Sequence, residues 1–65
     1  MNWDQVEGKW DQVVGRLRTK WAKLTDDDWQ AVKGRKEMLV GKLQERYGQK
    51  REDAERDVDT SIREL

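Results

Sequence analysis

Residues 3–17 read WDQVEGKWDQVVGRL and residues 29–43 read WQAVKGRKEMLVGKL, so the chain carries one pattern twice. A shift of 26 residues places the tryptophan, valine, glycine and leucine positions of the first copy on identical residues in the second. The identical pairs are Trp3 with Trp29, Val6 with Val32, Gly8 with Gly34, Val14 with Val40, Gly15 with Gly41 and Leu17 with Leu43. Neither unit is long enough to bury an apolar face alone, so we expect two related units packed on each other.

The apolar residues within each unit recur at the period of a helix. The stripe of the first unit consists of Trp10, Val13, Val14, Leu17, Trp21 and Leu24. This i, i+3, i+4, i+7 spacing predicts a long helix that continues to Leu24. The second unit repeats the spacing from Leu39 to Tyr47, and a third stripe predicts a closing helix over about 50–64. No segment alternates like a strand, so we predict none.

Two of the expected helix ends have a local chemical signature. Thr25 and Asp28 form a capping-box variant, in which each side chain bonds the backbone amide of the other residue. Asp26 and Asp27 then lie in the first turn, where the helix dipole favours negative charge. Gly48 follows Tyr47 directly and suits the left-handed position that ends a helix.

The other glycines leave the number of helices open. Gly8 and Gly34 each follow a short Trp-x-x-Val segment, and we interpret them as breaks between a short helix and a long one. The alternative is one unbroken helix over 3–24, because an internal glycine costs only about 1 kcal/mol. Gly15 and Gly41 lie nearly opposite the apolar stripe, which favours close approach of another helix over a shallow groove for a partner.

These patterns predict an all-α fold, a small open helical bundle of two related helical hairpins with four to five helices. One helical domain spans residues 1–65, with the repeat at 3–22 and 29–48 and the closing helix at about 50–64. A self-associating coiled coil is the weaker alternative, because two glycines interrupt its three heptads. We expect Trp10 and Trp21 in the core, whereas one of Trp3 and Trp29 could remain partly exposed.

The composition restricts the class of protein. Hydrophobic residues make up 34% of the chain and charged residues 43%, but the 14 basic and 14 acidic residues balance, unlike in most disordered chains. The chain has no cysteine and no apolar run near the roughly 20 residues of a membrane span. Its first residues lack the features of a signal peptide. We therefore expect a cytoplasmic monomer that does not insert into a membrane.

The sequence offers little catalytic chemistry. It contains no histidine and no cysteine, which removes the commonest general base and the best nucleophile. The glycines do not cluster into a phosphate-binding loop. Capping accounts for the run Asp26-Asp27-Asp28 better than a cation site does. We predict that the protein is not an enzyme and that it has no catalytic residues, cofactor or metal.

Basic residues form the candidate interaction surface. At about 100° per residue, they fall on one flank of the stripe in each unit. The set comprises Lys9, Arg16, Lys20, Arg35, Lys42 and Arg46. Two such ridges could follow a phosphate backbone, which makes nucleic-acid binding one alternative function. The simpler interpretation, favoured by the zero net charge, is a solvated flank whose long side chains cover the edge of the core.

Three stretches together resemble the CsbD-like family of small bacterial proteins. They are Trp21–Asp28, Gly34–Lys36 and Leu39–Gly48. The resemblance implies a compact bundle of two helical hairpins and a role in the general stress response of bacteria, and it implies no catalytic or ligand residues. Our leading hypothesis is therefore a non-catalytic stress-response protein that acts as a binding or protective module. A nucleic-acid-binding module and a helical protein–protein adaptor are the alternatives.

Overall fold

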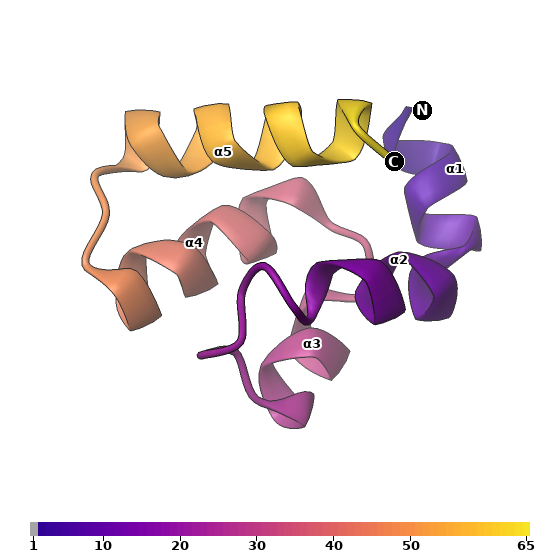
Figure 1. Cartoon of the computed structure of the whole chain (residues 1–65), viewed down its shortest axis with the longest axis horizontal. Coiled ribbons are helices and arrows are strands. Elements are labelled where there is room, and N and C mark those ends of the chain that lie inside the picture. Colours follow the sequence, from indigo (N-terminus) through magenta and orange to yellow (C-terminus); the bar gives the residue numbers. More distant parts are fainter. Residues whose placement is uncertain (1) are drawn as a thin grey trace.

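The computed structural model describes residues 2–65, which fold into five helices without a strand (Figure 1). The helices are α1 (Trp3–Gly8), α2 (Trp10–Leu17), α3 (Asp26–Val32), α4 (Lys36–Tyr47) and α5 (Arg51–Arg63). The predicted all-α bundle is confirmed. In Figure 1, α4 and α5 run antiparallel as one layer, and α1, α2 and α3 pack at their side and below.

The break expected at Gly8 is present. Helix α1 ends at Gly8, Lys9 leaves the helical region with φ −118° and ψ 28°, and α2 begins at the next residue. The alternative of one unbroken helix over 3–24 is therefore wrong.

The second break, between α3 and α4, depends on a glycine. Lys33 and Gly34 both have positive φ, 48° and 79°. A Cβ on Gly34 would lie 2.6 Å from the Cα of Glu7. Only glycine combines this backbone conformation with so close an approach to α1. The loop after α3 is thereby packed directly on the first helix.

The predicted extent of the long helix in the first unit is wrong. Helix α2 ends at Leu17, and residues 18–24 continue as turns. The amides of Lys20 and Trp21 both bond the carbonyl of Leu17, at 3.1 and 2.9 Å, and the amide of Leu24 bonds the carbonyl of Trp21 at 3.1 Å. These tight turns still direct Trp21 and Leu24 into the core, so the apolar period continues where the helix does not.

One core collects apolar side chains from all five helices and the turn segment. Its members are Val6, Val13, Val14, Leu17, Trp21, Leu24, Trp29, Val32, Leu39, Val40, Leu43, Ala54, Val58 and Ile62. The positions related by the shift of 26 share this burial at four pairs of residues, among them Val6 and Val32, which are both 0% exposed. Gly48 ends α4 with φ 66°, as predicted.

Trp10 is the one tryptophan whose placement differs from the prediction, because Trp21 lies in the core and Trp3 is the partly exposed member of the pair Trp3 and Trp29. Trp21 and Trp29 are 4% and 2% exposed, so Trp29 belongs to the core. Trp10, expected there, is only partly buried, and so is Trp3. The Nε1 of Trp10 donates a hydrogen bond to the carbonyl of Trp29, 3.0 Å away, which fixes its indole at the edge of the core. An indole that needs a partner for its N–H is often held at such a boundary.

The close helix approach favoured for Gly15 and Gly41 is also wrong. A Cβ built on either residue would meet no atom within 4 Å. Both glycines face open space, because neighbouring helices pack on the apolar stripe and leave the opposite side of α2 and α4 uncovered.

Candidate functional site

Among residues 2–65, the carboxylate of Asp28 makes the largest number of polar contacts. Thr25 caps α3, and the predicted capping box is formed. The amide of Asp28 donates to Thr25 Oγ1 at 3.1 Å, and the amide of Thr25 donates to Asp28 Oδ2 at 3.0 Å. Unlike most capping residues, Asp28 is buried, with 3% of its surface exposed. A buried charge requires further partners.

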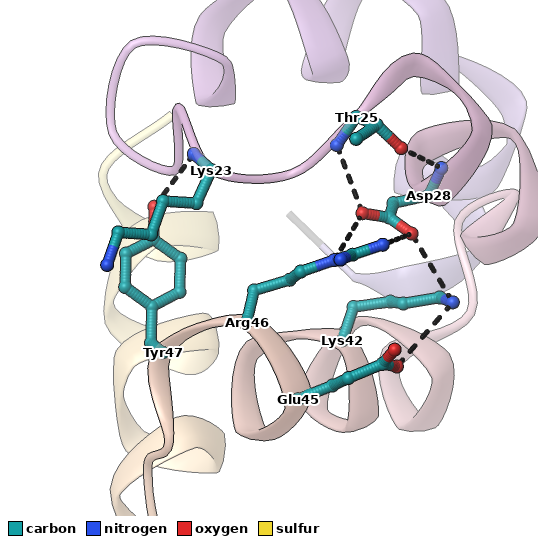
Figure 2. A network of polar contacts seen from close by, with 7 residues as sticks. All are labelled: Lys23, Thr25, Asp28, Lys42, Glu45, Arg46 and Tyr47. Carbon is teal, nitrogen blue, oxygen red and sulfur yellow. Dashed lines mark hydrogen bonds and ion pairs between the residues drawn. The ribbon is translucent and has the colours of Figure 1, made fainter.

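Two cations of α4 supply those partners (Figure 2). Arg46 donates from Nε to Oδ2 of Asp28 at 2.9 Å and from Nη2 to Oδ1 at 3.1 Å, a bidentate pair. Lys42, one turn earlier on the same face, places Nζ 3.4 Å from Oδ1. Lys42 also lies 3.8 Å from a carboxylate oxygen of Glu45. We call Asp28, Lys42 and Arg46 the Asp28 cluster.

The Asp28 cluster has clear electrostatic consequences. The hydrogen bond from Arg46, and after it the bond from the Thr25 backbone, hold the pKa of Asp28 well below its ordinary value, although burial acts in the opposite direction. The bond to Asp28 raises the pKa of Arg46. Both groups are therefore charged at neutral pH. Because Asp28 lies on α3 and its cations on α4, the cluster fixes how these helices meet.

A second contact joins the turn segment to the end of α4, beside the Asp28 cluster. The amide of Lys23 donates to the hydroxyl of Tyr47 at 3.2 Å, and Nζ of Lys23 lies 5.1 Å from the centroid of the Tyr47 ring. Figure 2 shows the Lys23 side chain beside the Tyr47 ring, whereas Arg46 extends away from it toward Asp28. Lys23 follows Lys20 by three residues, a helical spacing that places it on the same basic flank of the first unit.

The six residues of the candidate interaction surface do not form two matching ridges. Lys42 and Arg46 lie together in the Asp28 cluster, with side chains 23% and 39% exposed. Lys9 and Arg16 lie together along a small surface groove of about 170 Å³ that also contacts Leu65. The remaining two are isolated from these pairs, Lys20 with Nζ 5.6 Å from the centroid of the Trp21 ring and Arg35 at the residue that precedes α4.

Within residues 2–65, no group of three or more acidic, histidine or cysteine side chains is placed to hold a metal ion. Over the same residues, no helix has the length and apolar character needed to cross a bilayer.

Comparisons with known proteins show which family this chain resembles. The model of the CsbD-like family matches residues 4–56. A UPF0337 protein of Mesorhizobium japonicum is 64% identical over 59 residues, which cover 91% of this chain and 88% of the relative. The UPF0337 protein YjbJ of Escherichia coli is 47% identical over 60 residues, covering 92% and 87% of the two chains. No solved structure matches this chain.

Proposed function

Because the chain belongs to the CsbD-like family of bacterial proteins, we propose that it is a non-catalytic general stress-response protein of the cytoplasm. Its role is that of a binding or protective module, and the charged exterior is the part that acts. The protein remains folded and dissolved when stress concentrates the cell interior, and it keeps its neighbours hydrated and apart.

The distribution of charge is the observation that carries this proposal. Basic and acidic residues number 14 each, and nearly all of their side chains lie at the surface around an apolar core. Several are paired across the surface, as Lys36 with Asp59 at 2.7 Å and Arg51 with Glu55 at 2.9 Å. Among residues 2–65, Met38 is the one large hydrophobic side chain that is exposed, and interspersed charges of both signs bind water strongly and oppose aggregation.

The use of the polar groups supports the non-catalytic part of the proposal. The buried carboxylate of Asp28 is neutralised by Arg46 and Lys42 and bonded to the backbone of Thr25, so its hydrogen-bonding capacity serves the fold. A pKa held low is typical of a structural carboxylate, whereas a general acid or base works best with a pKa near the operating pH.

A desiccation assay tests the protective role. Lactate dehydrogenase is dried and rehydrated with this protein, with an equal mass of serum albumin, or alone, and the recovered activity is measured. We expect higher recovery than with albumin. A matched variant replaces four exposed charged residues with glutamine, namely Lys50, Arg51, Glu52 and Asp53, which keeps the net charge at zero. We expect it to protect less. Recovery no better than with albumin would refute the role, and equal protection by the variant would refute the charged surface as its cause.

One observation favours nucleic-acid binding as a second candidate. Arg16 and Lys20 take no part in an ion pair within residues 2–65, although they are the repeat counterparts of Lys42 and Arg46. The counterpart of Asp28 at the shift of 26 is the neutral Asn2, so the first unit has no buried acid for its two cations. A fluorescence titration with mixed-sequence DNA at low and moderate salt tests this function. No spectral change at low salt would eliminate it.

A further inference from the structure

An open groove of about 380 Å³ runs between α2 and α3. Helix α2 lines it with Trp10, Asp11 and Gly15, Arg18 follows directly after that helix, and α3 contributes Trp29. Both helices lie next to each other in Figure 1. The volume is within the range of roughly 300–1,000 Å³ typical of sites for small ligands or single side chains.

The floor of the groove is open because of Gly15. No atom lies within 4 Å of the position that its Cβ would occupy, and its φ is not positive, so the backbone does not require glycine. Gly41, its repeat counterpart, likewise faces open space but does not line this groove. The two glycines thus form a matched pair, one inside a groove and one outside.

Trp10 forms a fixed aromatic wall. Its Nε1 is bound to the carbonyl of Trp29, and the two ring centroids are 6.0 Å apart with the planes tilted by 54°. The indole remains partly exposed beside the groove. An indole face held in one orientation and open to solvent attracts a cation, since the ring quadrupole is negative above its plane.

The charges around the groove favour the same kind of ligand. Arg18 and Asp26 neutralise each other in an ion pair across the groove. Asp11 has no ion-pair partner within residues 2–65. The lining therefore carries one excess negative charge, placed on the residue next to Trp10.

We propose that the α2–α3 groove binds an arginine side chain of a partner protein. The aliphatic stem lies over Gly15, the guanidinium stacks on Trp10, and the carboxylate of Asp11 accepts its hydrogen bonds. Arginine fits better than lysine because its planar fork both stacks on indoles and bonds carboxylates in pairs. This site is separate from the dispersed surface charge of the proposed protective role, so either can fail while the other stands.

The test uses three capped peptides of identical length that carry arginine, citrulline or glutamate at the central position. Binding to the full chain is followed by tryptophan fluorescence and by amide chemical shifts of residues in α2 and α3. We expect the arginine peptide to shift these resonances and the glutamate peptide to have no effect. Citrulline, which has the same shape without the charge, should bind more weakly by about two- to fivefold. Equal binding of arginine and citrulline peptides, or no shifts at millimolar peptide, would overturn the proposal.

Substitutions locate the contact. Gly15→Leu fills the groove and should weaken binding of the arginine peptide by about tenfold or more. The matched control Gly41→Leu should bind the peptide as tightly as the parent does. Asp11→Lys should abolish binding. Neither glycine variant needs to disturb the fold, because both positions are open, and thermal melting followed by circular dichroism checks this. Equal loss in both glycine variants would refute the groove as the site. A dimer that Gly15→Leu dissociates would assign the groove to a second copy of this chain and overturn the partner proposed here.

Discussion

The contact between Gly34 and α1 allows a stability prediction with an internal control. Gly34 and Gly48 both have positive φ, 79° and 66°. A side chain at Gly48 would meet no atom within 4 Å, whereas a Cβ at Gly34 would lie 2.6 Å from Cα, 3.0 Å from Cβ and 3.2 Å from N of Glu7. Substitution of each glycine by alanine therefore adds the same backbone strain at both positions and a backbone collision at only one.

The magnitudes follow from these two terms. Left-handed backbone costs an alanine about 1–2 kcal/mol, and the smaller entropy of the unfolded chain offsets about 0.4–1 kcal/mol of it. Gly48→Ala should therefore lower the free energy of unfolding by about 1 kcal/mol. At Gly34 the helix α1 must also move away from the loop, and overpacking of this kind costs about 1–3 kcal/mol. We expect a total loss of about 2–4 kcal/mol for Gly34→Ala, a large part of the roughly 3–10 kcal/mol typical of a domain of this size.

Urea unfolding monitored by tryptophan fluorescence and far-ultraviolet circular dichroism measures both variants. Two-state analysis with a common m-value gives the difference between them. Equal destabilisation by Gly34→Ala and Gly48→Ala would show that α1 does not press on the loop after α3, and the packing of the first helix on the second unit would be refuted.

Three further predictions concern the Asp28 cluster, the core and the surface. Because the pKa of Asp28 is lowered in the folded state, the contribution of its carboxylate to stability is complete above the ordinary aspartate pKa and is lost as the pH falls below about 4. Urea unfolding at several pH values should therefore show the unfolding free energies of Asp28→Asn and of the parent converging in acid. A difference that stays constant with pH would contradict this. Trp21→Ala, which truncates a side chain that is 4% exposed, should cost about 3–5 kcal/mol; a thermal midpoint like the parent's would place Trp21 outside the core. Arg18→Ala breaks an ion pair whose side chains are 51% and 74% exposed, so the free energy of unfolding measured in urea should fall by no more than about 1 kcal/mol, and by less in high salt. A larger loss of stability would mean that Arg18 contributes by packing.

Local chemistry made much of the fold predictable from the sequence. The capping box of Thr25 and Asp28, the left-handed Gly48 and the break at Gly8 depend only on residues within a few positions of one another. The period of the apolar residues identified most of the core. It did not identify where α2 ends. In the turns after Leu17, amides bond the carbonyl three residues earlier, and such turns keep an apolar side chain facing inward almost as a helix does.

The candidate site could be predicted only in part, because its contacts join distant parts of the chain. A helical wheel places Lys42 and Arg46 on the flank of the apolar stripe, and that flank was interpreted as solvent-facing. Whether a flank faces solvent depends on the element that packs beside it. Here that element is the first turn of α3, where Asp28 lies 18 residues before Arg46 in the sequence. No pattern in the neighbouring residues predicts that Asp28, the acid of the capping box, also pairs with Lys42 and Arg46. The exposure of Trp10 escaped prediction for the same reason, since it is set by a bond to the carbonyl of Trp29.

The two copies of the pattern diverge where an acid is present in only one of them. Helix α3 begins three residues before Trp29, whereas α1 begins at Trp3 itself, so the second unit gains an additional turn that carries Asp28. This carboxylate binds Lys42 and Arg46 and makes the second basic flank part of the packing between α3 and α4. The first flank has no such acid, and its cations stay at the surface. A repeat that builds one core twice thus differs at its surfaces through a single buried charge, which makes the second basic flank part of the packing between helices and leaves the first exposed.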